Sequence, residues 1–584
     1  MEKCFTKGAH FTNTNNVEVL LRGMSYSTSI LIWLKKNRDL AILITIATLF
    51  FFIYSYPNMG APLKFNSPDE GANYFFSQMY AEKGELRHFE QLNEKVQGII
   101  HPRAISVKDS YLVPGSFLGM NLLYGTLAKF FGLKIITYLT PLFSVLAVLF
   151  FYGLLKRIFT SKIAFLSGLF LLIHPAFWYY SSRGMFHNVL FVALLIIGSY
   201  WLISATRMLH EYHECYTNNK EMKWGRHIRF ALAMLFIGLA LIVRTSEIWW
   251  IGITYFILFL NFREHIKWQY LLVGFLVLIL IFIPIFYYNK ILYGNPLSTG
   301  YPRVVESSSL ESVESSVFSS RSSLSFLSSR FLSYLFPFGV HPISFLSNFC
   351  KYYIWIFWWY FVPFVVGFTL FIKNFRKKKR LERIYLTLFV FISLWLVTCY
   401  GSWVFYDNPD PREISIGTSY VRYWLPIYIL SLPFVSFAFL EFSRKVKKVI
   451  LDSLLICCFV ALSFYLTLWG TSESLAKVKD NIVRYKNIER MVETLIPSQS
   501  VIISERADKI FFPHWRVISL EEKTWDSQRL QELVKKWPVY YYSELEDKDV
   551  EYINQKKLKR YKLRITQKRK ITEQNNLYKL ILYE

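Results

Sequence analysis

Long apolar runs recur along this chain, and they constrain its fold more than any other feature. A helix needs roughly 20 apolar residues to cross the hydrocarbon core of a bilayer. Of the 584 residues, 53% are hydrophobic, and many runs reach or approach that length. A soluble chain of this size would divide into several domains, with polar stretches interrupting its apolar ones. The sequence therefore predicts an all-α polytopic membrane protein.

About eleven transmembrane helices follow from these runs. They are expected at residues 40–56, 135–155, 163–180, 189–205, 228–243, 248–260, 268–288, 352–372, 384–404, 424–442 and 449–469. A further apolar segment, 112–133, places Asn121, Gly125 and Lys129 on one polar stripe. Its opposite face is apolar and consists of Phe117, Met120, Tyr124, Leu127 and Phe131. This pattern predicts an interfacial juxtamembrane helix that does not cross the bilayer.

The basic residues predict an orientation. A formal net charge of +26 would suggest a nucleic-acid partner in a soluble protein. In a membrane protein, Lys and Arg instead collect in cytoplasmic loops. If 112–133 does not cross, the dense basic clusters all fall on one side, at 156–162, 207–229, 263–267, 373–380 and 444–448. We therefore expect a multi-pass plasma-membrane protein with a cytoplasmic N-terminus and no nucleic-acid partner.

This orientation divides the chain into regions. Residues 1–39 form a cytoplasmic segment and 40–469 a transmembrane domain, which includes outer loops at 57–134 and 289–350. A serine-rich tract, 307–329, is typical of a flexible loop, and a flap over an active site is the alternative. Residues 470–584 lose the long apolar runs and alternate helix-like with strand-like stretches. They predict a small extracytoplasmic α/β domain with an accessory role.

An acidic pair in the first outer loop is the first candidate for chemistry. Pro68 favours a helix start, which places Asp69 and Glu70 in the first turn. Such acids are common at helix starts and need not be functional. Arg183, Arg244 and Arg422, however, lie at the outer ends of spans, where positive charge is unexpected. Three arginines near the same surface as an acidic pair predict a site for an anionic ligand, although Glu247 is also placed to pair with Arg244.

These residues resemble the motifs of GT-C glycosyltransferases, especially family 39, which includes protein O-mannosyltransferases and lipid A aminoarabinose transferases. The resemblance covers about 40–469 and rests on the order of short motifs. These are Asp69-Glu70, His101-Pro102, the 113–117 turn with its amphipathic helix, Trp178-Tyr-Tyr-Ser-Ser-Arg183, Arg244-Thr-Ser-Glu247 and Arg422-Tyr423. His187-Asn188 stand where relatives often place an acidic residue.

The resemblance implies transfer of a sugar from a polyprenyl-phosphate donor to a lipid, glycan or protein acceptor on the outer face. Because phosphate is a good leaving group, one general base suffices, and Asp69 takes that role, with inversion at the anomeric carbon. Glu70 would orient the acceptor or bind a metal. The three arginines, with Tyr74, His101 and Tyr423, would bind the substrates.

Two other functions and one cofactor stay open at this point. The chain also fits a transporter or flippase for lipid-linked glycans, although no internal repeat is evident. An oligosaccharide polymerase or ligase would share the lipid donor. No set of His, Cys and carboxylate residues has decisive metal-ligand spacing, so a divalent metal ion remains open as a cofactor.

Overall fold

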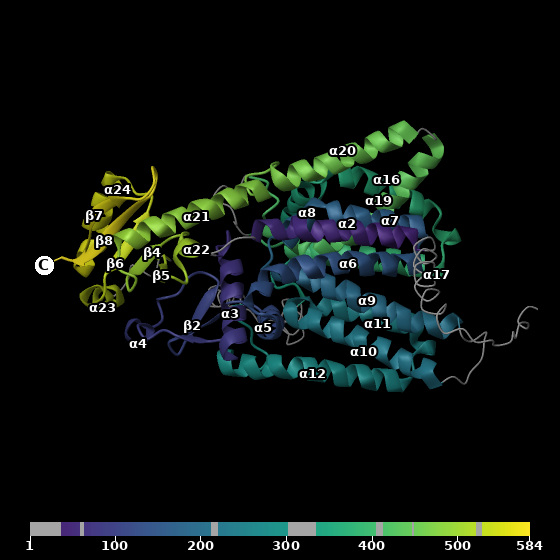
Figure 1. The fold of residues 1–584 in the computed structure, drawn as a ribbon, viewed down its shortest axis with the longest axis horizontal. Helices are drawn as coiled ribbons and strands as arrows, with labels where there is room; N and C mark the ends of the chain where they lie inside the picture. Colours follow the sequence, from purple (N-terminus) through teal and green to yellow (C-terminus); the bar gives the residue numbers. More distant parts are fainter. Residues whose placement is uncertain are drawn as a thin grey trace, which may run out of the picture.

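The computed structural model describes residues 37–58, 63–211, 220–301, 335–404, 413–446, 449–520 and 528–583. Long helices lie side by side along the longest axis, and a mixed α/β unit caps one end of them (Figure 1). The expectations for residues 1–36 and for the serine-rich tract 307–329 fall outside the described residues.

Each predicted span coincides with a helix or a helix pair, although not every one has the length of a full span. The bundle consists of α2 (Arg38–Ser55), α6 (Ile136–Ile158), α7 (Ser161–Ile173), α8 (Pro175–Ser182), α9 (His187–Glu211), α10 (Lys220–Val243), α11 (Ile248–Phe262), α12 (Trp268–Tyr293), α16 (Trp358–Lys373), α17 (Arg380–Gly401), α19 (Leu425–Val446) and α20 (Val449–Leu468). Among the described residues, seven helices are long and apolar enough to cross a membrane, or up to nine if bent pairs count as single spans. The other two predicted spans are the 15-residue α11 and the shorter apolar helix Ser453–Leu468 within α20.

The first of the two bends has a local cause in the sequence. Helices α7 and α8 meet at 52°, where Pro175 cannot donate a backbone hydrogen bond and His174 takes an extended conformation. The second bend, of 98°, separates the segment Pro342–Trp355 from α16. The first bend turns α8 so that its C-cap residue, Arg183, lies at the end of the bundle nearest the α/β unit.

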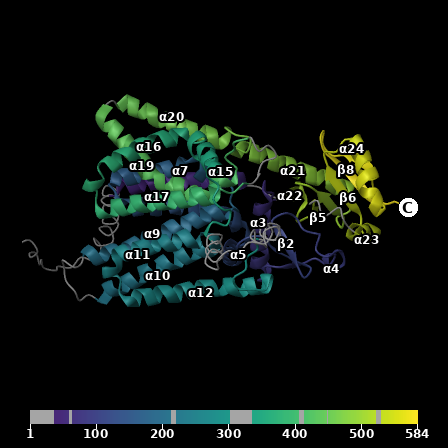
Figure 2. The same ribbon diagram turned by 180° about the vertical axis from the view of Figure 1, so that it is seen from behind.

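The described part of residues 57–134, hereafter the first loop, forms a compact layer at that end (Figures 1 and 2). It contains α3 (Pro68–Lys83), α4 (Asn93–Val96), α5 (Gly119–Phe131) and a three-stranded antiparallel sheet in the order β1-β3-β2 (His88–Phe89, Tyr111–Pro114, Ile105–Lys108). At 13 residues, α5 is about 20 Å long, which is too short to cross a bilayer of about 30 Å. This agrees with the predicted juxtamembrane helix.

The predicted polar stripe on this helix is wrong in one respect. Asn121 is fully buried and Gly125 packs against α3, where an added Cβ would lie 2.7 Å from the Ser77 carbonyl oxygen. The sequence pattern placed Gly125 on the polar side of the helix, although it lies at a close contact between α5 and α3. The spacing of residues does not reveal what a small residue packs against.

Residues 470–584, hereafter the tail domain, form the α/β unit at the end of the bundle. Its five-stranded sheet has the order β5-β4-β6-β8-β7, with β4 parallel to β5 and β6 and antiparallel pairing beyond. The strands are Val501–Ser504 (β4), Arg516–Ser519 (β5), Val539–Ser543 (β6), Leu563–Lys570 (β7) and Asn576–Leu582 (β8), and the helices are α21 (Leu475–Leu495), α22 (Asp508–Phe511), α23 (Gln528–Lys536) and α24 (Asp547–Tyr552). The α/β expectation is confirmed, but β7 was not predicted, because its sequence LRITQKRK has little apolar character.

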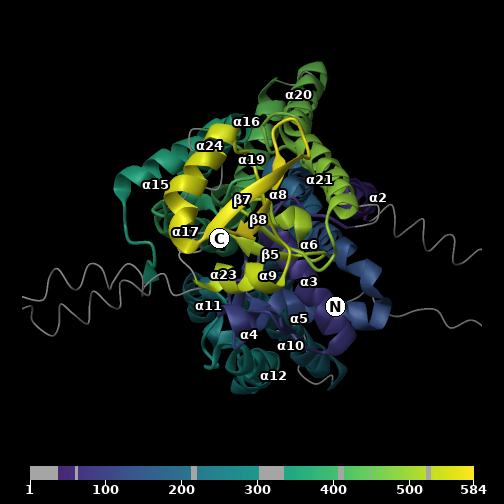
Figure 3. The same ribbon diagram turned by 90° about the vertical axis from the view of Figure 1, so that its left-hand side faces the viewer.

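Three ion pairs join the first loop to the tail domain. Lys64 pairs with Glu489 at 2.6 Å, Arg103 with the buried Asp508 at 2.6 Å, and Arg516 with Glu90 at 2.8 Å. The tail domain consequently lies over the end of the bundle, as the end-on view shows (Figure 3). This arrangement encloses a space between the two units.

Candidate active site

The acidic pair occupies the first turn of α3, as the sequence predicted. Ser67 is the N-cap, Pro68 follows as the first helical residue, and the Ser67 amide donates to Glu70 Oε2 at 3.2 Å in a capping box. Successive helical residues point about 100° apart. The two carboxylates therefore face different surroundings, with Glu70 directed into the protein and Asp69 toward the enclosed space.

Glu70 forms a buried ion pair with Arg183. Arg183 Nε lies 3.0 Å from each carboxylate oxygen, Nη2 also donates to Oε2, and Nη1 donates to the Tyr179 hydroxyl at 2.6 Å. Only 3% of the Glu70 side chain and 6% of the Arg183 side chain are exposed. Both oxygens of Glu70 are therefore engaged by groups that fix Arg183 and the start of α3.

Asp69 has a different partner and is more open. Arg422, on the short helix α18 (Ser419–Tyr423), donates from Nη1 to Asp69 Oδ2 at 3.1 Å, and its Nη2 donates to Ser419 Oγ at 2.7 Å. The Asp69 side chain is 39% exposed and that of Arg422 is 15% exposed. Water reaches both side chains, so a polar ligand can bind beside the Asp69 carboxylate and the Arg422 guanidinium.

Arg244 forms an ion pair with Glu247, as the spacing of three residues between them allowed. Arg244 Nη2 is 2.6 Å from Glu247 Oε1 and donates to the Tyr400 hydroxyl at 3.1 Å. Trp250 Nε1 donates to the second oxygen of Glu247 at 2.6 Å. Arg244 is only 5% exposed, so its position is set by buried partners.

Two aromatic rings connect the three arginines. The Phe186 ring centre lies 5.1 Å from Arg183 Cζ and 4.8 Å from Arg422 Cζ. The Tyr423 ring centre lies 5.3 Å from Arg422 Cζ and 4.8 Å from Arg244 Cζ. Cations are attracted to ring faces at such distances. The structure thus gathers Asp69, Glu70, Arg183, Arg244, Arg422 and Tyr423 at one end of the bundle.

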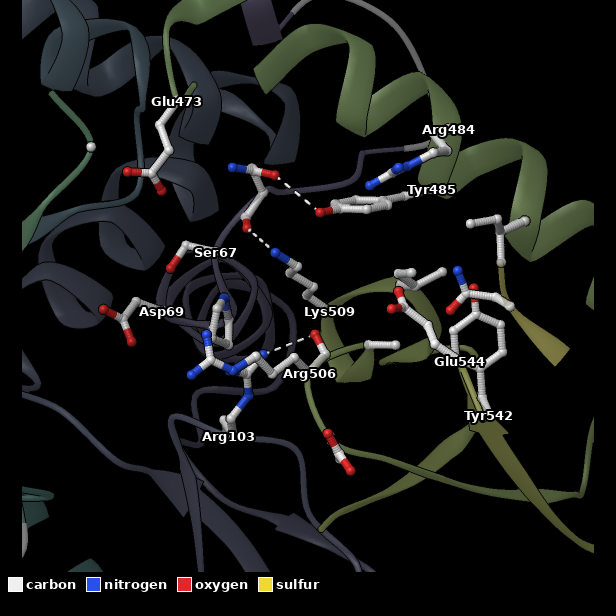
Figure 4. A pocket seen from close by; sticks show the side chains of 18 of the residues that line it. Ser67, Asp69, Arg103, Glu473, Arg484, Tyr485, Arg506, Lys509, Tyr542 and Glu544 are labelled. Atoms are coloured by element: carbon white, nitrogen blue, oxygen red, sulfur yellow. Dashed lines mark hydrogen bonds between the residues drawn. The ribbon is translucent and has the colours of Figure 1, made fainter. Parts of the chain in front are cut away.

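Asp69 and Arg422 line a cavity of about 1140 Å³ between the first loop, the bundle and the tail domain. In Figure 4, Asp69 and Glu473 lie on one side of it, and Arg484, Tyr485, Tyr542 and Glu544 lie on the other. The tail-domain wall also carries charged groups, namely Glu505, Arg506, Lys509 and Glu573. Sequence reasoning missed this wall, because its residues come from separate elements whose pairing only the fold reveals.

Of the predicted residues, Asp69, Arg183 and Arg422 line this cavity, whereas Glu70, Arg244, Tyr423, His101 and Tyr74 do not. The backbone of His101 forms an isolated parallel bridge with Ile518, and its carbonyl oxygen accepts a hydrogen bond from the Ser519 amide at 3.3 Å. It therefore serves in the contact between the first loop and the tail domain, whereas its neighbour Arg103 reaches the cavity. The Tyr74 ring packs on Phe65 at 5.4 Å. Burial raises the pKa of the Tyr74 hydroxyl, and Glu82 adds to the rise.

No cluster that fits a metal ion is present in the part of the chain that the structure describes. There, no three His, Cys, Asp or Glu side chains come together in a manner that would hold one. Asp69 and Glu70 each have an arginine partner instead. Where relatives often carry a further acid, His187 Nε2 lies 3.1 Å from the Phe117 carbonyl oxygen.

Sequence comparison alone identifies no relative: no family model matches the chain, and no curated protein does. Solved structures do match. The structure of ArnT from Cupriavidus metallidurans bound to undecaprenyl phosphate superposes with a TM-score of 0.52 and 12% identity, over 92% of this chain and 97% of that one. The chain therefore shares the fold of ArnT.

Two further structures share that fold. The apo form of ArnT gives a TM-score of 0.53 at 12% identity, again over 92% of this chain and 97% of ArnT. The archaeal oligosaccharyltransferase AglB from Archaeoglobus fulgidus, in complex with an inhibitory peptide and a dolichol-phosphate, gives 0.51 at 13% identity over 90% of this chain and 71% of AglB. The GT-C resemblance read from the motifs is thus confirmed at the level of fold.

Proposed function

We propose that this protein is a membrane glycosyltransferase that uses a sugar linked to a polyprenyl phosphate and inverts the anomeric carbon. One observation carries the proposal: the partly exposed Asp69–Arg422 pair, 3.1 Å apart, lies on the wall of a large polar cavity in a GT-C fold. ArnT was solved with undecaprenyl phosphate and AglB with a dolichol-phosphate, which supports a lipid-phosphate donor here.

Arg422 is the group we assign to the donor phosphate. The Asp69 side chain is 39% exposed toward the cavity, so an incoming phosphate can reach Arg422 there and replace Asp69 as its partner. Guanidinium groups suit phosphate because they donate two hydrogen bonds in parallel. Arg183 and Arg244 are neutralised by buried partners. They would hold Phe186 and Tyr423, and through these rings Arg422, in position.

The exchange of partners would release Asp69 for its own role. Asp69 accepts the proton of an acceptor hydroxyl or amine as the acceptor attacks the anomeric carbon. The new bond forms on the face opposite the phosphate, and the bond from carbon to phosphate oxygen breaks with its electron pair staying on the phosphate. Arg422 stabilises that charge, and Asp69 passes its proton to water. Glu70 acts indirectly in this scheme, because its carboxylate is committed to Arg183.

The tail-domain wall supports a polar acceptor. Carboxylates and guanidinium groups alternate with the rings of Tyr485 and Tyr542 around the cavity. Carboxylates accept hydrogen bonds from hydroxyl groups, arginines donate them, and rings cover apolar faces of a sugar or peptide. We accordingly assign residues 470–584 to acceptor binding and residues 40–469 to the donor and the chemical step, with both opening outside the plasma membrane.

The competing functions predict different positions for the charged residues. A transporter would place its charged residues along a path at the middle of the membrane. Here the acidic pair and the three arginines cluster at the end of the bundle next to the tail domain, which favours a transferase. An oligosaccharide ligase shares this geometry, and the likeness to AglB keeps it as the second candidate.

Mass spectrometry of lipid-linked sugars and surface glycans, with and without the gene, tests the proposal. We expect a lipid-linked monosaccharide to accumulate in the deletion strain while one glycan residue disappears from the surface. A lipid-linked oligosaccharide that accumulates on the outer leaflet would favour the ligase. Accumulation on the inner leaflet would favour a flippase and contradict the proposal.

A further inference from the structure

A second cavity, with an apolar wall and a cationic rim, lies at the opposite end of the bundle from the candidate active site. It has a volume of about 730 Å³ and is bordered by α2, α6, α9 and α10. Helix α9 packs on both α6 and α10, and α2 packs on α6. This cavity shares no lining residue with the one that contains Asp69.

Aromatic side chains form its inner wall. The rings of Phe150 and Tyr200 meet edge to face at 5.0 Å, and Tyr200 meets Trp201 at 5.3 Å. Gly153 makes room for this wall, since an added Cβ would lie only 2.7 Å from the Tyr200 ring. Together with Leu149, these groups offer an apolar surface to whatever occupies the cavity.

Cationic side chains form its rim. Lys156 is exposed, while Arg157 and Arg229 are partly buried. Arg157 is fixed in place: its Cζ lies 4.1 Å above the Tyr200 ring and its Nη1 donates to the Gly153 carbonyl oxygen at 2.9 Å. Among the described residues that line the cavity, none is acidic. The described lining therefore carries a net positive charge, which favours a negatively charged ligand.

The position of the rim along the helices indicates the source of that group. Lys156 and Arg157 are in the last turn of α6, and Arg229 is near the start of the apolar span Gly225–Val243 of α10. Residues at the ends of membrane-spanning helices lie at the level of the lipid headgroups. Phosphate at that level belongs to a lipid, and its acyl chain would continue along the apolar wall.

We propose that this cavity binds an anionic glycerophospholipid. The lipid phosphate lies between Lys156, Arg157 and Arg229, and an acyl chain follows Leu149, Phe150 and Trp201. Basic pockets between transmembrane helices are suited to such headgroups, and each cation near the surface contributes severalfold to the affinity. An anionic lipid fits better than a zwitterionic one because the rim offers no described carboxylate to a choline or ethanolamine group.

The test uses the full-length protein in detergent, with binding measured by native mass spectrometry and by the rise in melting temperature. The probes are phosphatidylglycerol, phosphatidylcholine with the same acyl chains, and inorganic phosphate. The first variant is Lys156→Gln/Arg157→Gln/Arg229→Gln. Its matched control is Lys373→Gln/Arg376→Gln/Lys377→Gln, which removes the same charge from exposed positions between α16 and α17.

We expect phosphatidylglycerol to bind and stabilise the protein, and the triple variant to lose about 100-fold in affinity while the control loses little. Because Arg157 also packs on Tyr200, the single variant Lys156→Gln supplies a fold-neutral measurement, with an expected loss of about fivefold. Equal binding of phosphatidylcholine would overturn the proposal, as would equal protection by inorganic phosphate. Equal loss in the control variant would show general charge attraction and would overturn it too.

Discussion

Glu70 pairs with the buried Arg183, whereas Asp69 pairs with the more exposed Arg422. The two acidic residues can therefore have different roles, which variants of Glu70 test. Glu70→Gln keeps the size of the side chain and can still cap α3 through its amide oxygen. It removes the negative charge opposite a guanidinium whose side chain is only 6% exposed. Breaking one partner of a buried pair costs about 3–5 kcal/mol, because the remaining charge is left uncompensated.

The free energy of unfolding is measured by titration with SDS in mixed micelles, followed by tryptophan fluorescence. Glu441→Gln provides the control, since Glu441 pairs with Arg444 at 3.5 Å and the Arg444 side chain is 80% exposed. This control should change the free energy by less than about 1 kcal/mol. The double variant Glu70→Gln/Arg183→Met removes both charges and should be more stable than the sum of the single effects by about 1–3 kcal/mol.

A Glu70→Gln protein no less stable than Glu441→Gln would refute this reasoning. In that case Arg183 would not depend on Glu70, and the carboxylate would be available to bind acceptor or metal as the sequence first suggested. Additive single variants would lead to the same conclusion, because groups that do not interact show no coupling energy.

Three other variants test the structure that surrounds the candidate active site. Asp508→Asn weakens the contact with Arg103 by about 1.5–3 kcal/mol and should expose the tail domain to limited proteolysis, which gel electrophoresis of the fragments would show. Gly125→Ala forces α5 from α3 and should cost about 1–3 kcal/mol in the same SDS titration. Burial lowers the pKa of His88, although Glu90 opposes this, so the unfolded state takes up a proton at higher pH than the folded state. Stability should thus fall as the pH drops below about 6.5, and His88→Gln should lose that dependence in melting curves at several pH values.

Much of the fold was predictable from the sequence because membrane spans and helix starts are local signals. Apolar run length located the spans, and Pro68 with two acids located the start of α3. The strand-like stretches of the tail domain were found for the same reason, whereas β7, with its basic sequence, was not.

The site was predictable only in part. The motifs identified the three arginines as site residues. Which arginine pairs with Asp69 or Glu70 depends on tertiary contacts between residues that are far apart in the sequence. Glu70 and Arg183 are 113 positions apart, and Asp69 and Arg422 are 353 apart. No local pattern decides which arginine meets Asp69 or Glu70, whereas the spacing of three residues did indicate the pair of Arg244 and Glu247. For the same reason, the sequence did not predict the tail-domain wall of the cavity or the backbone contact of His101 with Ile518.

The central claim is that Asp69 is the base of a sugar transfer, and complementation of a deletion strain with Asp69→Asn tests it most directly. Glu82→Gln, an exposed acid on the same helix, is the matched control. The measured quantities are the lipid-linked donor and the surface glycan, by mass spectrometry, together with the amount of folded protein in the membrane. The account predicts that Asp69→Asn folds, accumulates donor and lacks the glycan, while Glu82→Gln restores it. A folded Asp69→Asn protein that restores the glycan would contradict the account.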